Sequence, residues 1–302
     1  MRLGVCMSAF RDEALPDVLR WAGGAGFECV EISCAPVRGP AGWFDGPDLR
    51  LAGLDGPSRD ALGAALDGSG LKAAALEWDG DLMDADPAAA RAAAEQAPGV
   101  IEAAATLGVP VVAIRLGRDP AMSLGDTIAE FARRAAPLAA QAESSGVRLA
   151  VANDPECGRH FEDMPGAAAF APELWEKLFT HLRSRAVGLA LDPAPLVWLG
   201  VDPIAAMTDY FEKVFHLRAR DVEVLDLARQ DCSVLRPGSG WWRYRLPGLG
   251  QIDWRRLIDR LHELSYDGAI AVRHDDPVWQ GSPDRMKTGL GLARRHLVQF
   301  MP

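Results

Sequence analysis

Short apolar runs alternate with longer amphipathic segments along the 302-residue chain. This alternation is typical of repeated strand–helix units and a parallel sheet. Eight strands are expected, at residues 3–7, 29–32, 71–76, 111–115, 148–152, 188–191, 214–217 and 269–272. Helices are expected at residues 15–23, 87–107, 122–144, 172–183, 203–213, 253–264 and 283–300. Eight such units favour an α/β fold of the closed (β/α)8 TIM-barrel type, which needs about 250 residues.

No linker or break in composition divides the chain, so residues 1–302 are expected to form a single domain. The segment from about 221 to 252 is long and shows little regular pattern, which is typical of a lid or a binding loop. An open doubly wound sheet would usually carry a glycine-rich dinucleotide turn after its first strand. Here Met7-Ser8-Ala9-Phe10 follows instead, so no nicotinamide cofactor is expected.

The formal net charge of −10 argues against a nucleic acid or an anionic membrane surface as partner. No apolar run approaches the roughly 20 residues of a membrane span. The five cysteines form no Cys-x-x-Cys pair, which favours reduced thiols and a cytoplasmic location. A small-molecule substrate is therefore the expected partner.

In closed barrels the working residues lie at the C-terminal ends of the strands and in the loops that follow. Side chains two residues apart share one face of a strand. His216, Arg218 and Arg220 therefore share a face, whereas His274 lies on the face opposite Arg273. The polar residues at or just beyond these strand ends are Glu77, Asn153, Asp154, Asp192, His216, Arg218, Arg220, Arg273, His274 and Asp275.

Two stretches near the C-terminal end, GLGQIDW at 248–254 and YDGAIAVRHDDP at 266–277, carry a family resemblance. They resemble the last strand–helix unit of the sugar phosphate isomerase/epimerase family, the xylose isomerase-like TIM barrels. Asp192-Pro193, Val197-Trp198 and Phe215-His216 match the family as well. The resemblance implies a barrel that moves protons next to a carbonyl, interconverting aldoses and ketoses or epimerising a carbon. It also implies a possible homo-oligomer, since members often form dimers or tetramers.

The family binds a divalent metal through Glu, Asp, His and Glu from strands five to eight. At these positions this chain has Ala152, Asp192, Arg218 and Arg273. Alanine offers no ligand and arginine cannot be deprotonated to become one, so no metal cofactor is expected. Asp192, Arg218 and Arg273 together carry a charge of +1, which predicts a pocket suited to an anion.

The altered residues suggest their own chemistry. Arg218 and Arg273 are expected to reach Asp192 in the barrel mouth, to clamp an anion and to stabilise a developing oxyanion. Asp192 is the first candidate for moving the proton, with Glu77, Asp154, His216 and His274 as others. The remaining expected substrate contacts are Asn153, Arg220, Trp242, Arg245 and Asp275. Trp241 and Trp242 could equally pack the lid onto the barrel rim, and His216 could be a core histidine.

Three hypotheses follow. The first is a metal-independent isomerase or epimerase-like enzyme that acts on a polar, anionic, sugar-like molecule. The second is a catalytically inactive homologue in which arginine–carboxylate pairs plug the old site and the chain binds a ligand or a partner subunit. The third is a metal-dependent isomerase with displaced ligands, namely Asp154, Asp192, His216 and Asp275.

Overall fold

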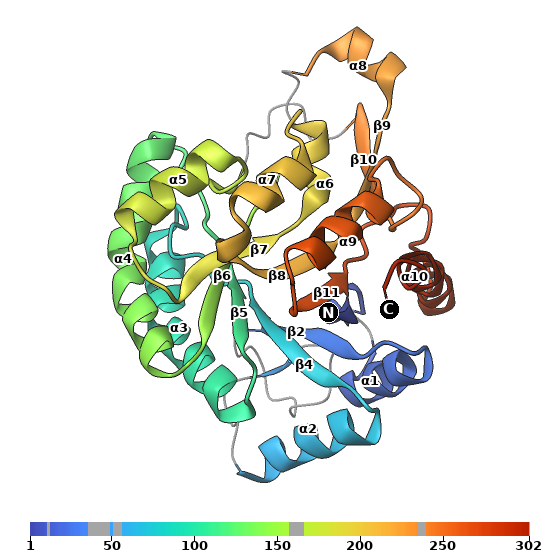
Figure 1. Cartoon of the computed structure of the whole chain (residues 1–302). Helices are drawn as coiled ribbons and strands as arrows, with labels where there is room; N and C mark the ends of the chain where they lie inside the picture. The colour runs from blue at the N-terminus through green and yellow to red at the C-terminus, as the bar shows by residue number, and fades with distance from the viewer. Residues whose placement is uncertain (11–12, 36–48, 51–55, 157–165, 235–239, 302) are drawn as a thin grey trace.

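A closed barrel of eight parallel strands forms the centre of the molecule (Figure 1). The computed structural model describes residues 1–10, 13–35, 49–50, 56–156, 166–234 and 240–301. Strand β1 pairs with β2 on one side and with β11 on the other, which closes the ring and confirms the expected fold class. The barrel strands are β1 Arg2–Cys6, β2 Cys29–Ala35, β4 Lys72–Trp78, β5 Val111–Ile114, β6 Arg148–Ala152, β7 Val187–Leu191, β8 Val214–Ala219 and β11 Ala269–Val272.

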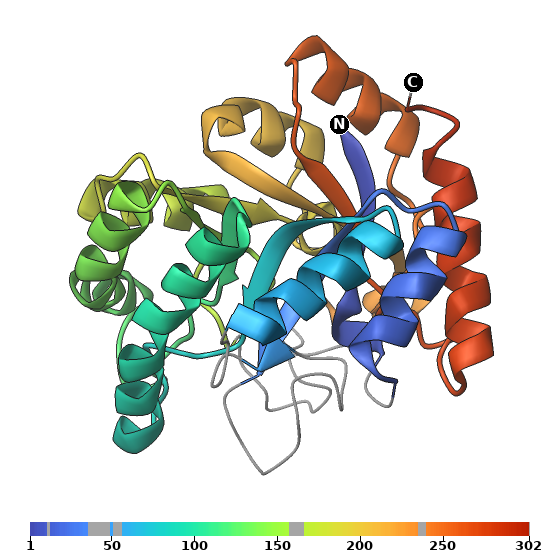
Figure 2. The same cartoon turned by 90° about the horizontal axis from the view of Figure 1, so that it is seen from below.

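Helices surround the barrel, and the side view shows α1 and α2 side by side on its outer face (Figure 2). Helices that follow barrel strands are α1 Leu15–Gly24, α2 Gly56–Gly68, α3 Pro87–Leu107, α4 Leu124–Ser144, α5 Pro172–His181, α6 Pro193–Trp198, α7 Pro203–Asp209, α9 Trp254–Glu263 and α10 Pro283–Leu297. Short 3-10 helices occupy η1 Met7–Ala9 and η2 Phe211–Lys213, and β3 Leu49–Arg50 extends the sheet beside β2.

The sequence pattern predicts all eight barrel strands with ends within three residues, but it misses two of the helices that follow barrel strands. Helix α2 contains Gly56, Gly63 and Gly68, and only its Leu62 is fully buried, so its helical signal is weak. Helix α6 has only six residues and begins at a proline directly after Asp192, whose side chain accepts a hydrogen bond from the Ala194 amide. An expected helix over 203–213 is instead α7 followed by η2.

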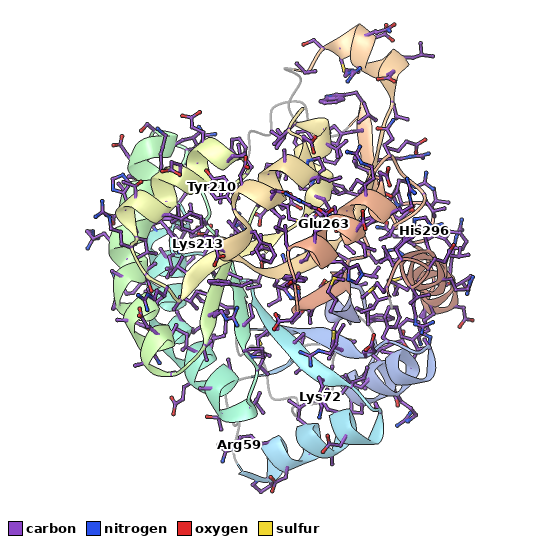
Figure 3. All side chains as sticks on the ribbon, in the orientation of Figure 1. Arg59, Lys72, Tyr210, Lys213, Glu263 and His296 are labelled. Atoms are coloured by element: carbon purple, nitrogen blue, oxygen red, sulfur yellow. The ribbon has the colours of Figure 1, made fainter. Side chains whose placement is uncertain are left out.

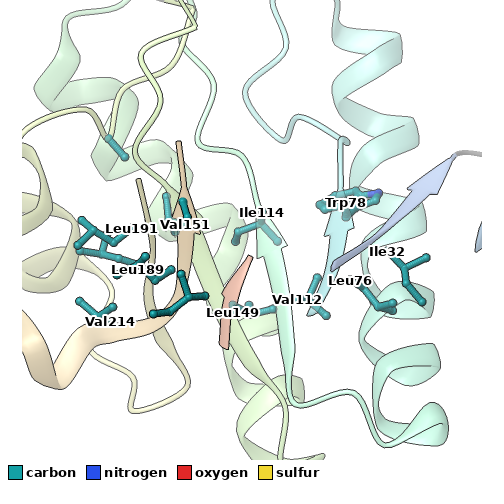
Figure 4. Packing of buried hydrophobic residues seen from close by; sticks show 14 of the residues in the cluster. Ile32, Leu76, Trp78, Val112, Ile114, Leu149, Val151, Leu189, Leu191 and Val214 are labelled. Carbon is teal, nitrogen blue, oxygen red and sulfur yellow. The ribbon is translucent and has the colours of Figure 1, made fainter. Parts of the chain in front are cut away.

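The two faces of the barrel strands differ in side-chain size. Large side chains such as Val112, Leu149 and Leu189 point outward and pack under the helices (Figure 4). The alternate positions carry small residues, so Ala75, Val111, Ala113, Ala150 and Ala190 form a separate buried cluster. This alternation follows from the two-residue period of a strand. Small residues inside the barrel leave space for the longer polar side chains of β8.

The segment at 221–252 is more regular than the sequence pattern indicates. Strands β9 Asp221–Val224 and β10 Trp242–Arg245 form an antiparallel ribbon, with α8 Asp226–Cys232 between them in the chain. In Figure 1 the ribbon and α8 project from one side of the barrel. Trp242 stacks on Trp198 of α6, with ring centroids 4.4 Å apart, and thereby packs the ribbon against the barrel.

Asp221 anchors the chain that leads from this ribbon into α9. Its fully buried carboxylate accepts hydrogen bonds from the Val222, Gly248 and Ile252 amides and from the indole nitrogen of Trp254, at 2.8 to 3.1 Å. A side chain at position 250 would overlap Asp221, so Gly250 is required by this close approach. The GLGQIDW motif therefore has a structural role.

The outer surface is charged in the manner of an ordinary globular protein. Glu263, labelled in Figure 3, pairs with Arg260 on α9 at 2.6 Å, and its side chain is 57% exposed. Among the described residues, no helix has both the length and the apolar character needed to cross a membrane.

Replacing Asp221 tests the anchor. Asp221→Ala should lower the free energy of unfolding by about 3 kcal/mol or more, because four donors lose their buried acceptor. Urea unfolding measures this loss, and Asp221→Asn should lose less because it keeps one acceptor oxygen. Asp226→Ala removes an exposed acid of α8 and should stay within about 0.5 kcal/mol of the parent. Equal losses in Asp221→Ala and Asp226→Ala would contradict the anchor.

Candidate active site

Polar side chains gather at the C-terminal ends of the barrel strands around a cavity of about 80 Å³. Glu77, Asp154, Arg218 and Arg273 line it, together with Ala152 at the end of β6. These four polar residues are among the expected site residues. The residues that line the cavity are Glu77, Trp78, Asp79, Ala113, Ile114, Arg115, Ala152, Asp154, Glu156, Arg218 and Arg273.

Strand β8 and the residue that follows it supply a row of three inward-facing side chains, as the two-residue period of a strand predicts. His216, Arg218 and Arg220 are all buried, with 1%, 6% and 2% of their surface exposed. Each binds at least one carboxylate from another strand or loop. We call the connected ionic residues the mouth network, which comprises Glu31, Glu77, Asp154, Asp192, His216, Arg218, Arg220, Arg273 and Asp275.

Glu31 of β2 lies at the deep end of this network and is fully buried. Its carboxylate lies 2.5 Å from Nε2 of His216 and accepts hydrogen bonds from Nε and Nη2 of Arg218 at 3.2 and 2.8 Å. Burial raises the pKa of Glu31, but Arg218 and His216 outweigh that effect and hold it below its usual range. The sequence analysis missed Glu31. An acid inside the apolar run Cys29-Val30-Glu31-Ile32 is the signal that would have indicated it.

Glu77 at the end of β4 joins the two arginines that stand at family metal-ligand positions. Its Oε1 accepts from Nη2 of Arg218 at 2.8 Å and from Nη1 of Arg273 at 2.5 Å. Nε of Arg273 also donates to Asp275 at 3.3 Å. Burial raises the pKa of Glu77, yet Arg273 and Arg218 together lower it below its usual value. The two guanidinium groups therefore lie close together because they share one ionised carboxylate, and each also binds a second acid.

Arg220 is surrounded by three carboxylates from three different strand ends. It pairs with Asp154 after β6, with Asp192 after β7 at 2.8 Å, and with Asp275 after β11 at 2.8 Å. The ring of Tyr244 from β10 covers the guanidinium, with its centroid 3.6 Å away. Only 3% of the Arg220 side chain is exposed. A single buried cation thus holds the ends of three strands together.

The arrangement corrects the expected partner of Asp192. The interior direction of Arg218 and Arg273 agrees with the strand pattern, but the ion pair of Asp192 is with Arg220. Arg218 is held instead by Glu31 and Glu77, two acids that lie far from it in the sequence. The expected charge of +1 is likewise wrong, because the network contains five carboxylates and three arginines.

The residues present do not fit the divalent metal that the family resemblance implies. Ala152, Arg218 and Arg273 supply no ligand oxygen or neutral imidazole at three of the four positions. The displaced set of Asp154, Asp192 and Asp275 converges on the Arg220 guanidinium. Within the described ranges, no group of three His, Cys, Asp or Glu side chains is placed to hold a metal ion.

Two carboxyl groups differ from the others in their proton affinity. Burial raises the pKa of Asp192 to about 6 against the opposing charge of Arg220. Partial burial raises the pKa of Glu156 to about 7; Arg115 opposes this, and Asp154 and Asp79 add to it. By contrast, Arg273 and Arg220 overcome the effect of burial on Asp275 and lower its pKa to about 2. Groups whose pKa values are pushed apart are candidates for acid and base roles.

Glu156 and Arg115 are site residues that the sequence analysis missed. Glu156 lies in the loop after β6 with a positive φ of 53°, and its carboxylate pairs with Arg115 at 2.7 Å. Arg115 follows β5 and also lies 3.4 Å from Asp81. Both residues line the cavity. Their positions directly after strand ends were the available signal.

Four expected site residues have structural contacts outside the mouth network. Asn153 exchanges two hydrogen bonds with the backbone of Asp192, which ties β6 to β7. Trp242 is buried against Trp198, in agreement with the packing alternative. Arg245 pairs with Glu223 and Asp276 at 2.8 and 2.9 Å. Buried His274, the fourth, has a lowered pKa because of its burial.

Removing Arg220 tests whether it holds the strand ends. Arg220→Met should lower the free energy of unfolding by about 3–5 kcal/mol at pH 7.5, because three buried carboxylates lose their cation. Without Arg220 the folded-state pKa values of Asp154 and Asp275 rise, so the deficit should shrink as the pH falls toward 5. Urea unfolding at both pH values measures it. Arg133→Met, which removes a 71% exposed arginine of α4, is the control and should have little effect. A pH-independent deficit would contradict the ionic explanation.

Known proteins share the sequence pattern and the fold of this chain. Residues 19–296 match the family described as xylose isomerase-like TIM barrel. The chain is 28% identical over 98 residues to the uncharacterized protein YfiH of Bacillus subtilis, and 29% identical over 105 residues to an inosose dehydratase of Clostridium beijerinckii. These matches cover 30% and 34% of this chain, and the chain spans about a third of the length of these curated relatives, 31% and 35%. The structure of the probable 3-DHS dehydratase AsbF of Bacillus anthracis shares the fold, with a TM-score of 0.72, 13% identity and 99% coverage of both chains. The chain belongs to the xylose isomerase-like TIM-barrel family.

Proposed function

We propose that this chain is an isomerase or epimerase-like enzyme that works without a divalent metal. Its substrate would be a small polar, sugar-like molecule with a carbonyl group. The observation that carries the proposal is that Arg218, Arg273 and Glu156 line one cavity at the barrel mouth. This combines fixed positive donors with a carboxyl group whose pKa lies near neutrality.

The proposed step is a proton transfer next to the carbonyl. The carboxylate of Glu156 removes the proton from the neighbouring carbon, and the electron pair left behind forms the carbon–carbon double bond of an enediolate. The carbonyl oxygen then takes the negative charge, which preorganised donors stabilise. In an isomerisation the proton returns to the former carbonyl carbon, while the hydroxyl proton of the neighbouring carbon moves to the former carbonyl oxygen. In an epimerisation the proton returns to the opposite face of the carbon that lost it, and the carbonyl is restored. Asp192, buried beside Arg220, is the second candidate acid.

The hydrogen-bond pattern of the two arginines supports this role. Nη1 of Arg218 and Nη2 of Arg273 make no hydrogen bond with any residue that the structure describes, while their other nitrogens bind Glu31, Glu77 and Asp275. The carboxylates thus fix the orientation of each guanidinium and leave one terminal nitrogen for a ligand. This is the preorganisation that an oxyanion site requires.

The long segment at 221–252 is proposed to cover the site, as a lid would. Its support is Tyr244, which stacks on Arg220 and donates a hydrogen bond to Asp154 at 3.4 Å. The net charge of −10 supports a small molecule rather than nucleic acid or an anionic membrane as partner. A cytoplasmic location and a homo-oligomeric state remain proposals.

The second candidate function is a catalytically inactive homologue that binds a ligand or partner. It is favoured by the extent to which the arginines are already engaged, since Arg218, Arg220 and Arg273 each bind at least two carboxylates. Such pairs would fill the old metal site and leave no group free for chemistry. Turnover separates the two candidates.

Deuterium exchange tests the enzyme proposal. Incubation in D2O with a panel of aldoses and ketoses should place deuterium next to the carbonyl of at least one of them, also in the presence of EDTA. Glu156→Gln should lower that rate by about 10²–10⁴-fold, the usual contribution of a general base. Arg273→Met should lower it by about 10²–10³-fold. Mass spectrometry of the sugars measures the rates.

The controls and contrary outcomes are as specific. Glu130→Gln alters a half-buried residue and Arg133→Met an exposed residue of α4, and both variants should keep the parent rate. Exchange that EDTA abolishes and Mn²⁺ restores would favour the metal-dependent alternative with displaced ligands. No exchange with any sugar, together with a sharp loss of stability in Arg273→Met, would favour the inactive homologue.

The pH profile provides a separate prediction. If Glu156 acts as the base, its ionised form is the active one, so the exchange rate should rise with an apparent pKa of about 7. Arg115→Met removes the cation that opposes the raised pKa of Glu156. The rise of the exchange rate should therefore move to higher pH. Initial rates between pH 5 and 9 measure both curves. A profile that is flat across pH 6–8 would exclude Glu156 as the base.

A further inference from the structure

The charges that the structure describes at the barrel mouth do not balance. Four arginines face eight carboxylates, which gives a net charge of −4 when all are ionised. The arginines are Arg115, Arg218, Arg220 and Arg273, and the carboxylates are Glu31, Glu77, Asp79, Asp81, Asp154, Glu156, Asp192 and Asp275.

The positive charges are already neutralised by protein groups. Arg220 is enclosed by three carboxylates and a tyrosine ring, and only 3% of its side chain is exposed. Arg218 and Arg273 share Glu77, and each binds a second acid. Arg115 lies between Asp81 and Glu156. An anionic ligand would therefore meet compensated cations beside an excess of acids.

The negative charge is least compensated at one side of the cavity. Asp79 follows β4, is exposed, and forms no ion pair with any residue in the described part of the chain. Glu156 lines the same cavity, and its one ion pair among the described residues is with Arg115. A cleft with excess charge of one sign concentrates ligands of the opposite sign. The cavity itself thus favours a positively charged group near Asp79 and Glu156.

An organic ammonium group suits the excess carboxylates of the cavity better than a metal ion does. Within the described residues, no three acid, His or Cys side chains converge as a metal would need. Spaced carboxylates and guanidinium groups instead suit a molecule with several hydroxyls, since a hydroxyl both donates and accepts hydrogen bonds. An ammonium group supplies three donors and a single charge, which suits carboxylates that do not surround one point.

We propose that the ligand of this cavity is a polyhydroxylated small molecule that carries a protonated amine, such as an amino sugar. The inference rests on the proposed function, because it names the ligand class of the same site. The ammonium group lies against Asp79 and Glu156, and hydroxyls contact Glu77 and the terminal nitrogens of Arg218 and Arg273. This proposed ligand class differs from the anionic substrate that the sequence predicts, because the arginines are already paired with acids.

A matched set of sugars tests the ligand class. For glucose, galactose and mannose, the parent sugar is compared with its 6-amino-6-deoxy and uronic acid forms, so that position 6 is neutral, cationic or anionic. Calorimetric titration of the intact protein at pH 7.5 and low salt should show the amine form of at least one sugar binding at least tenfold tighter than its parent. The uronate should bind most weakly. The preference for the amine should shrink in 0.5 M salt, where charges are screened.

Variants locate the preference. Asp79→Asn and Glu156→Gln should each lower the ratio of amine to parent affinity at least threefold, whereas Glu130→Gln on α4 should keep it. Equal or tighter binding of the parent or the uronate, or no binding by any of the three forms, overturns the ligand class. Binding tests the ligand class, and deuterium exchange tests the enzyme proposal. Tighter binding of the amine form without deuterium exchange overturns the enzyme proposal alone. Exchange in a neutral sugar without any preference for the amine overturns the ligand class alone.

Discussion

The buried guanidinium of Arg220 is the constraint on which the barrel mouth depends. Removing an isolated charge from water costs several kcal/mol, so a cation that is 3% exposed must be matched by anions with good geometry. Asp154, Asp192 and Asp275 provide the match from the ends of three strands. Tyr244 covers the remaining face. The positions of these strand ends and of the β10 ribbon are thus set by one side chain.

The same network divides the acids into two groups with different properties. Carboxylates that bind arginines closely, such as Glu77 and Asp275, have lowered pKa values and stay ionised at neutral pH. Glu156 lies farther out, pairs with Arg115, and has a pKa of about 7. Asp192 lies beside Arg220, and burial raises its pKa to about 6. These two carboxyl groups are the ones that we propose as the proton-exchanging groups. The structural and the chemical roles of the mouth therefore follow from the same distribution of charge.

The sequence predicts this site in part, and the limit is physical. The two-residue period of a strand places His216, Arg218 and Arg220 inside the barrel, and the structure agrees. The partners are different, because ion pairs form between residues far apart in the chain: Glu31 lies 185 residues from His216. Burial of the Glu31 carboxylate within an apolar strand is unfavourable unless a partner such as His216 or Arg218 compensates its charge. The positions of the eight strands along the chain follow from local periodicity. The ion pair between Asp192 and Arg220 depends on closure of the barrel, which brings their strands together.

A tethered arginine also differs from the divalent ion of related barrels in its consequences. It cannot dissociate or be deprotonated, so a mouth held together by Arg220 would assemble when the chain folds, as the proposed metal-independent enzyme requires. It carries one positive charge where a divalent ion carries two. Three carboxylates around Arg220 therefore keep an excess charge of −2 at its position. If arginine has replaced the metal, as we propose, the described carboxylates still leave the mouth negative, and the proposed ligand would supply the positive charge that restores the balance.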